Sequence, residues 1–194
     1  MAACPSCGVE NPAEARFCMS CAAPLASEPA REQRKVVTVV FCDLVGSTAL
    51  GESTDPEALR GRMRRYFEDL RVILERHGGS VEKFVGDAVM AVFGIPTSHE
   101  DDALRAVRAA SEMREAISEH GLEARIGINT GEVVVGGEGE TLVTGDAVNV
   151  AARFEQAAAA GEILIGDETR LLVRDAVQLE PVEALTLKGK SHPV

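Results

Sequence analysis

Apolar and polar positions along the chain show two kinds of pattern, one typical of strands and one typical of helices. Short runs rich in Val, Ile and Phe predict strands over residues 36–42, 80–85, 88–93, 123–129, 132–135 and 163–165, with further strands near 177–180 and 184–187. Apolar residues at helical spacing predict helices over residues 55–77, 98–120, 146–159 and 168–173. Gly86-Asp87 and Thr130-Gly131 are expected to form hairpin turns.

The helix starts carry their own signals. Asp55 is expected to be the N-cap of the first helix with Pro56 at its first position, and Ser98 is expected to cap the second. The resulting order of strand, helix, strand, strand, helix, strand predicts an α+β fold with a ferredoxin-like βαββαβ core. The sequence has no G-x-G-x-x-G or Walker A pattern, which argues against Rossmann and P-loop folds.

Net charge and hydropathy limit the kinds of binding partner and the cellular compartment that we expect. The net charge of −11 argues against general binding to nucleic acid or to an anionic membrane surface. No apolar run approaches the roughly 20 residues that span a bilayer, and the N-terminus lacks a signal-peptide pattern. We therefore expect a cytoplasmic protein without membrane insertion.

Four of the five cysteines form two C-x-x-C pairs near the N-terminus: Cys4, Cys7, Cys18 and Cys21. This spacing suits four thiolates around a structural Zn²⁺, whereas the alternative, a disulfide framework, fits a cytoplasmic chain poorly. The segment resembles a short zinc ribbon with no open metal position. We expect this segment to have a docking or regulatory role. The expected partner is a regulatory protein or a downstream domain. The expected boundaries are 1–25 for the ribbon, 26–35 for a linker and 36–194 for the large domain.

Asp43 and Asp87 each stand at the end of an apolar strand. A carboxylate there is costly unless it is paired or holds a cation, and two of them on neighbouring strands suit Mg²⁺. The alternative is that both are ordinary turn residues next to Gly46 and Gly86.

Five stretches, taken together, resemble the catalytic domain of class III nucleotidyl cyclases. They are 41–48 (FCDLVGST), 82–87 (EKFVGD), 125–131 (RIGINTG), 145–153 (GDAVNVAAR) and 187–190 (LKGK), in order across about residues 35–190. The resemblance implies that Asp43, Asp87 and the backbone carbonyl of Leu44 bind two Mg²⁺ or Mn²⁺ ions. It also implies the reaction of an adenylate cyclase, ATP to 3′,5′-cyclic AMP and pyrophosphate.

The same resemblance assigns residues to the substrate. Lys83 matches the position that recognises adenine, whereas guanylate cyclases usually have glutamate there. Leu142 falls on the second base-selecting position and cannot accept a hydrogen bond, although neighbouring Thr144 could replace that contact. The catalytic pair matches Asn149 and Arg153, and the triphosphate contacts match Arg125 and Lys188.

The family builds its site at a dimer interface, so the resemblance implies a homodimer. Asp43, Asp87 and Arg125 would come from one protomer, and Lys83, Asn149, Arg153 and Lys188 from the other. The family usually continues into one more strand beyond Val194, so we expect a C-terminally truncated catalytic domain. Two alternatives stay open: a guanylate or relaxed-specificity cyclase, and a catalytically silent module for dimerisation or nucleotide sensing.

Overall fold

The computed structural model describes residues 2–12, 15–23, 25, 32–46, 55–136, 143–183 and 185. In the N-terminal part, β1 (Ala2–Ala3) and β2 (Glu10–Asn11) pair antiparallel. The large domain contains, in chain order, β3 (Gln33–Leu44), α2 (Pro56–Arg76), β4 (Ser80–Val85), β5 (Ala88–Phe93), α3 (Asp102–Glu119), β6 (Ala124–Val135), β7 (Val143–Thr144), α4 (Asp146–Ala157), β8 (Ile163–Ile165) and α5 (Asp167–Val173).

The strands of the large domain form one mixed sheet. Its order is β4-β5-β3-β6-β7, and β8 pairs with β6 in parallel while the other pairings are antiparallel. The four strands of the βαββαβ unit are β3, β4, β5 and β6, and their spatial order is that of a ferredoxin-like core. The predicted fold class is confirmed.

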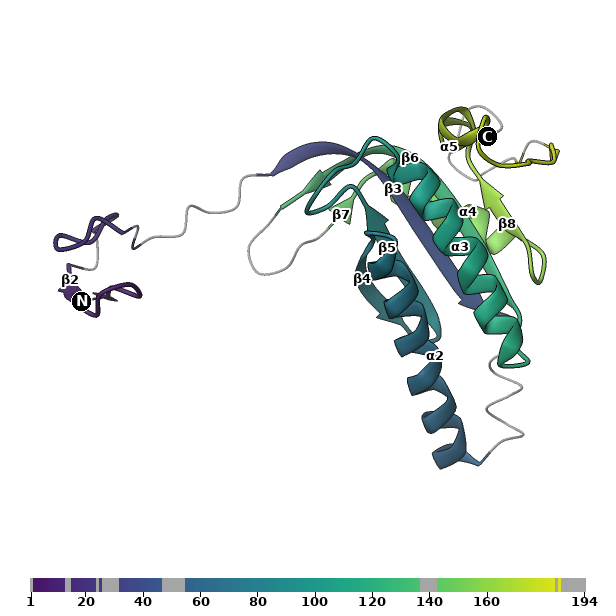
Figure 1. Cartoon of the computed structure of the whole chain (residues 1–194), viewed down its shortest axis with the longest axis horizontal. Coiled ribbons are helices and arrows are strands. Elements are labelled where there is room, and N and C mark those ends of the chain that lie inside the picture. Colours follow the sequence, from purple (N-terminus) through teal and green to yellow (C-terminus); the bar gives the residue numbers. More distant parts are fainter. Residues whose placement is uncertain are drawn as a thin grey trace.

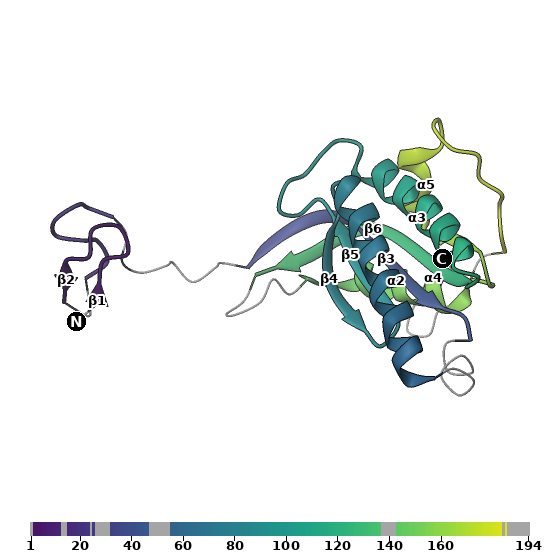
Figure 2. The same cartoon turned by 60° about the horizontal axis from the view of Figure 1, so that its bottom comes forward.

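Helices cover both faces of this sheet. Figure 1 and Figure 2 show α2 and α3 side by side on one face and α4 on the other. Because side chains alternate along a strand, β3 serves two cores. Val40, Cys42 and Leu44 pack with residues of α2 and α3, whereas Val37 and Val39 pack with residues of α4. Asp43 alternates with Cys42 and therefore lies on the α4 face.

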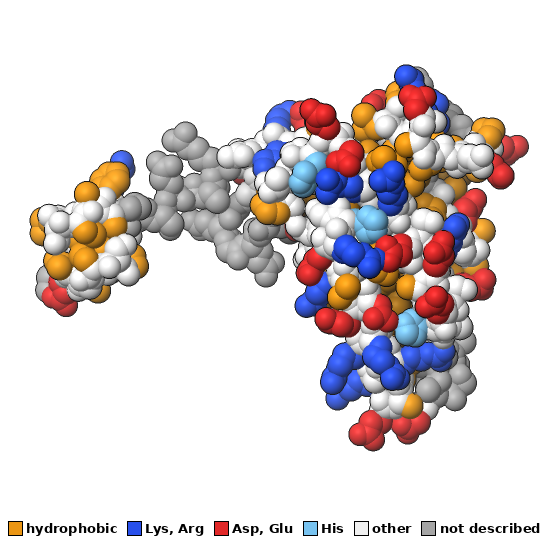
Figure 3. All heavy atoms as spheres, in the orientation of Figure 1, with side chains coloured by type: hydrophobic (Ala, Val, Ile, Leu, Met, Phe, Trp, Pro, Cys, Tyr) orange, Lys and Arg blue, Asp and Glu red, His pale blue; other side chains and the backbone are white. Residues whose placement is uncertain are grey.

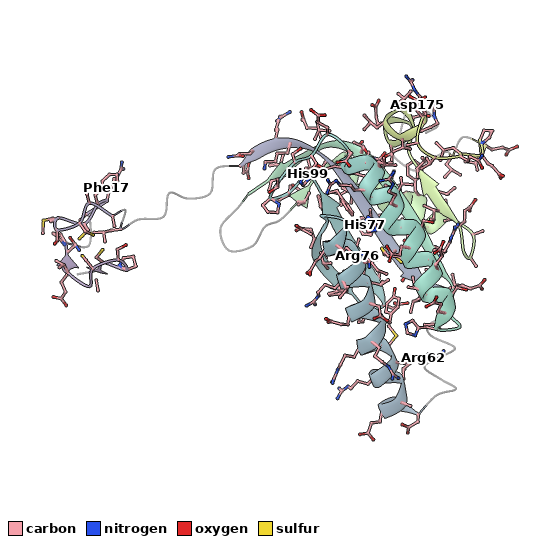
Figure 4. All side chains as sticks on the ribbon, viewed as in Figure 1. Phe17, Arg62, Arg76, His77, His99 and Asp175 are labelled. Carbon is pink, nitrogen blue, oxygen red and sulfur yellow. The ribbon has the colours of Figure 1, made fainter. Side chains whose placement is uncertain are left out.

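Polar pairs join α2 to α3 along their outer side. Arg76 and His77 both contact the carboxylate of Glu112, and Arg62 donates to the backbone carbonyl of His120 at the other end of the pair. Figure 4 shows Arg62 and Arg76 at these two levels of α2, and Figure 3 shows acidic and basic side chains intermingled on this face. None of the described helices combines the length and hydropathy needed to cross a membrane.

The expected 26–35 linker reaches too far, because β3 begins at Gln33, and three other sequence-based expectations also differ from the structure. Thr130-Gly131 is not a turn, because β6 runs unbroken from Ala124 to Val135. Gly131 is instead the place where α4 approaches the sheet, since an added Cβ would lie 3.0 Å from the Ala147 Cβ. The second helix begins at Asp102 rather than after Ser98. The Asp102 carboxylate accepts the His99 N–H at 2.7 Å, which stabilises a separate turn before that helix.

The third difference is in the tail, where residues 177–180 form no strand. They lead into Pro181, which lacks the N–H that a sheet ladder needs. The strand predicted over 184–187 lies outside the described residues apart from Leu185. The first helix and its Asp55 cap are confirmed, with the Asp55 carboxylate accepting from the N–H groups of Glu57 and Ala58.

Candidate active site

The register of the sheet brings Asp43, Asp87 and Arg125 together. Asp43 is directly opposite Arg125 in the β3–β6 pair. On the other side of β3, Cys42 pairs with Val89 of β5. The next position along each strand therefore places Asp43 beside the Gly86-Asp87 turn that joins β4 to β5. The buried Tyr66 hydroxyl of α2 donates to the Asp87 backbone carbonyl at 3.3 Å and supports that turn.

The three side chains form a partly buried charged cluster with a fourth, Glu155 of α4. Arg125 Nη2 donates to Asp43 Oδ2 at 2.7 Å and lies 3.3 Å from Glu155 Oε1. The side chain of Asp43 is 23% exposed, whereas that of Glu155 is 9% exposed. Burial raises the pKa of the Glu155 carboxyl, the Arg125 guanidinium opposes this, and the carboxylates of Asp43 and Asp87 raise it further.

Glu155 was not among the predicted site residues, although the sequence carries a signal for it. Ala147, Ala151 and Glu155 are four residues apart and occupy one buried stripe of α4. A carboxylate in line with two buried alanines requires a partner inside the fold. The spacing alone does not reveal that the partner is Arg125, because only the packing of α4 on β6 joins them.

Asp43 and Asp87 fit a hard divalent cation. Both offer carboxylate oxygens, the ligands that Mg²⁺ and Mn²⁺ prefer. Leu44, the predicted carbonyl ligand, is the last residue of β3 next to Asp43. Three carboxylates face one guanidinium here, so the cluster has a net negative charge that favours cations.

The remaining predicted site residues occupy other parts of the domain. Lys83 is exposed on the edge strand β4, opposite Met90 and therefore on the same sheet face as Asp43. Asn149 is exposed and Arg153 is half-buried on the side of α4 away from its buried stripe. Leu142 and Lys188 lie outside the described residues.

Thr144 is far from the charged cluster within one chain. It pairs with Val134, near the opposite end of β6 from Arg125. Val134 is nine residues after Arg125 along β6, which corresponds to about 30 Å. Thr144 instead lines a hollow of about 520 Å³ with residues of β6 and the start of α4. One chain therefore does not bring Thr144 and the acidic cluster into contact with the same nucleotide.

The N-terminal cysteines form a compact sulfur cluster. The Sγ atoms of Cys4, Cys7, Cys18 and Cys21 all lie within 4.8 Å of one another, with Cys4–Cys21 at 3.6 Å and Cys7–Cys18 at 3.5 Å. Four thiolates about 2.3 Å from a central Zn²⁺ would be separated by about 3.8 Å, so the spacing fits. Backbone N–H groups of Cys21 and Ser20 lower the pKa of Cys18 to about 6.

Two family models match this chain. Residues 30–194 match the adenylate and guanylate cyclase catalytic domain, and residues 4–25 match the zinc-ribbon domain. Adenylate cyclase 1 of Rhizobium meliloti is 30% identical over 175 residues, covering 81% of this chain and 26% of that relative. An adenylate cyclase of Mycobacterium tuberculosis is 31% identical over 164 residues, covering 79% of this chain and 37% of the relative. The chain thus spans well under half of the length of these two relatives.

Solved structures of both nucleotide specificities resemble the fold. The adenylyl cyclase CyaB from P. aeruginosa superimposes with a TM-score of 0.81 at 36% identity, covering 84% of this chain and 92% of that one. The guanylyl cyclase Cya2 superimposes with a TM-score of 0.79 at 35% identity, covering 83% and 89%. The chain therefore belongs to the adenylate and guanylate cyclase catalytic domain family, and a zinc-ribbon domain precedes its catalytic domain.

Proposed function

We propose that this chain is an adenylate cyclase that converts ATP to 3′,5′-cyclic AMP and pyrophosphate. The observation that carries the proposal is the register that places Asp43 opposite Arg125 and beside the Asp87 turn. A cation site next to a guanidinium suits attack of the ribose 3′-hydroxyl on the α-phosphorus with pyrophosphate as the leaving group. Such transfers depend mainly on positioning and electrostatic stabilisation.

Asp43, Asp87 and the Leu44 carbonyl are the proposed ligands of two Mg²⁺ or Mn²⁺ ions. When bound, these ions lower the pKa of the 3′-hydroxyl and neutralise the phosphate charge. Arg125 is the proposed contact of the triphosphate. Its guanidinium already lies 2.7 Å from Asp43, so it is next to the place where the phosphates must bind.

Asn149 and Arg153 are the proposed catalytic pair. They are four residues apart on α4, so they project from one side of the helix. Asn149 orients the ribose, and Arg153 stabilises the negative charge that develops on the phosphoryl oxygens. Lys188, which lies outside the described residues, is the second proposed triphosphate contact.

The proposed base is adenine, on account of Lys83, which is exposed on β4. Thr144 is the proposed second base contact, since Leu142 has no hydrogen-bonding group. The alternative is a guanylate or relaxed-specificity cyclase. One observation favours it: the guanylyl cyclase Cya2 is almost as similar to this chain as the adenylyl cyclase CyaB.

The proposed active unit is a homodimer with two shared sites. Asp43 pairs with Arg125 near one end of β6, whereas Thr144 pairs near the other end, about 30 Å away by strand length. A second copy in the opposite orientation can supply Thr144 to the acidic cluster of the first. This supports catalysis between protomers rather than within one. Lys83, Asn149, Arg153 and Lys188 are proposed to come from that second copy as well.

The zinc ribbon is proposed to hold one structural Zn²⁺ through its four cysteines. None of the four cysteines is in a disulfide, and together they would fill all four positions of a tetrahedral zinc site. The zinc would then have no position open for a substrate. The proposed role of the ribbon is therefore docking to a regulatory protein or to a further domain. Because zinc thiolates persist in reducing compartments, the cluster supports a cytoplasmic location.

Product analysis tests the reaction. The chain is incubated with ATP or GTP and Mn²⁺, with Asp87→Ala as the control, and the nucleotides are separated. Cyclic AMP that disappears in the variant is the expected result. Cyclic GMP as the main product would establish the guanylate alternative. Nucleotide binding without any cyclic product would instead indicate a silent nucleotide-sensing module.

Mixing two inactive variants tests the shared sites. Asp43→Ala lacks the proposed metal ligand of one protomer, and Arg153→Ala lacks the proposed catalytic group of the other. Each alone is expected to be inactive. Their heterodimer retains one intact site, so the mixture is expected to recover activity, and a mixture as inactive as its components contradicts the dimer model.

A further inference from the structure

Arg125 and Glu155 form a partly buried pair in which one donor atom and one acceptor atom have no hydrogen bond. Within the part of the chain that the structure describes, Arg125 Nε and Glu155 Oε1 are buried and neither has a hydrogen-bond partner. The nearest approach between the two groups is 3.3 Å, from Nη2 to Oε1. Buried polar atoms are normally hydrogen-bonded, so this unmatched donor and acceptor call for an explanation.

The fold holds Glu155 in place through its backbone. Gly127 is two residues beyond Arg125 on β6, and a Cβ there would lie 2.2 Å from both the Ala151 carbonyl oxygen and the Glu155 nitrogen. Because α4 touches the strand backbone at this point, Glu155 has little freedom to move away. Its carboxylate therefore starts from a backbone position held next to the Arg125 guanidinium.

The ion pair between Arg125 and Asp43 competes with the proposed functions of both residues. While Arg125 Nη2 donates to Asp43 Oδ2, one N–H of that nitrogen and one lone pair of that oxygen are occupied. Cations that bind Asp43 and Asp87 would repel the guanidinium and neutralise the charge that holds it there. A bound triphosphate offers that N–H a new acceptor, so we expect Nη2 to transfer from Asp43 to the nucleotide.

We propose that Glu155 is a positioning residue for Arg125. It accepts the Nε–H when Nη2 transfers from Asp43 to the nucleotide triphosphate, and it thereby keeps the guanidinium in the site. The inference rests on the proposed function, because it assumes that Arg125 contacts the triphosphate. Arg125 suits this role because a guanidinium can donate to a carboxylate from Nε and to a phosphate from Nη2 at the same time.

The proposal predicts a weakening of nucleotide binding that depends on Arg125. Glu155→Gln removes a negative charge that acts on both the cations and the triphosphate, and this direct effect on binding is present whether or not Arg125 is there. If Glu155 positions Arg125, the same change weakens binding. That weakening must disappear when Arg125 is absent.

The test is a double-mutant cycle read by calorimetry on the full chain. The ligand is 3′-deoxy-ATP with Mn²⁺, which lacks the attacking hydroxyl and reports binding without turnover. Glu155→Gln is expected to weaken binding about tenfold in the wild-type background and by less than about twofold in Arg125→Ala. Glu112→Gln is the control, because Glu112 pairs with Arg76 on the α2–α3 face of the sheet, the face opposite to that of Asp43.

The inference is overturned if Glu155→Gln weakens nucleotide binding equally in both backgrounds, leaves the affinity unchanged, or makes binding tighter. Thermal unfolding of each variant separates these results from loss of fold. If Glu155→Gln does not fold, Arg125→Lys gives the second measurement. Lysine keeps the charge but lacks the second donor group, so binding about tenfold weaker is expected and wild-type affinity contradicts the proposal.

The cycle also separates this inference from the proposed function. A chain that binds 3′-deoxy-ATP with the expected coupling but forms no cyclic nucleotide from ATP refutes the cyclase activity and supports the positioning. A chain that cyclises ATP without the coupling refutes only the positioning. A chain that does not bind the nucleotide refutes both.

Discussion

Replacing Gly127 by alanine tests the contact that fixes α4 on the sheet. The new Cβ would lie 2.2 Å from the Ala151 carbonyl oxygen and from the Glu155 nitrogen, whereas ordinary van der Waals contact begins at 3.4 Å. The difference, 3.4 − 2.2, requires α4 to move about 1.2 Å from β6. Both opposing atoms belong to the helix backbone, so no side-chain rotation can relieve the clash.

This displacement has two expected consequences. Overpacking of this kind costs about 1–3 kcal/mol of folding free energy or more. Because α4 carries the proposed catalytic residues Asn149 and Arg153, a shift of about 1 Å is also expected to lower the rate of cyclisation about a hundredfold. Urea unfolding followed by circular dichroism gives the first quantity, and cyclic nucleotide production at saturating Mn²⁺ gives the second.

Gly61→Ala is the matched control because it makes the same chemical change in open space. Gly61 is exposed within α2, and an added Cβ there meets no atom within 4 Å. Alanine in a helix interior is expected to stabilise the fold by about 0.5–1 kcal/mol. If Gly127→Ala were as stable and as active as Gly61→Ala, the backbone contact between α4 and β6 would be refuted.

Three further outcomes are expected. Thr130→Val removes a buried hydroxyl that lies 2.9 Å from each of two other threonine hydroxyls, and should cost about 1–3 kcal/mol in urea unfolding; an unchanged midpoint would contradict this. Cys42 should resist thiol reagents at pH 8 in the folded protein even after a chelator exposes the four ribbon cysteines, because burial raises its pKa to about 12; a fifth reactive thiol before unfolding would show otherwise. Tyr66→Phe removes the hydroxyl that donates to the Asp87 carbonyl, so Mn²⁺ affinity measured by titration should fall about tenfold, and undiminished affinity would show that this contact does not support the turn.

The sequence alone was sufficient for features whose cause is local. The start of α2 follows from a carboxylate at Asp55 that accepts backbone N–H groups before Pro56, and both are visible in the sequence. The βαββαβ order likewise follows from periodicity, since each strand and helix must bury one face. The two C-x-x-C pairs indicated the four-cysteine cluster, because their spacing is typical of four thiolates around one zinc ion.

The features that the sequence missed depend on contacts between distant segments. Thr130-Gly131 has the composition of a turn, but the packing of Ala147 over Gly131 keeps β6 extended. The Ser98 cap was wrong because the Asp102 carboxylate, on the following turn, binds the His99 backbone instead. In both cases a tertiary or medium-range contact outweighs the local preference.

The candidate site shows the same division. Motifs in the sequence identified Asp43, Asp87 and Arg125 as separate candidates from three different strands and turns. Only the strand register decided that Asp43 faces Arg125, and only the approach of α4 to Gly127 placed Glu155 beside them. A sequence determines which groups a chain offers and which local elements carry them. The tertiary structure decides which charges meet, because register and interhelical distance are set by the packing of residues far apart in the chain.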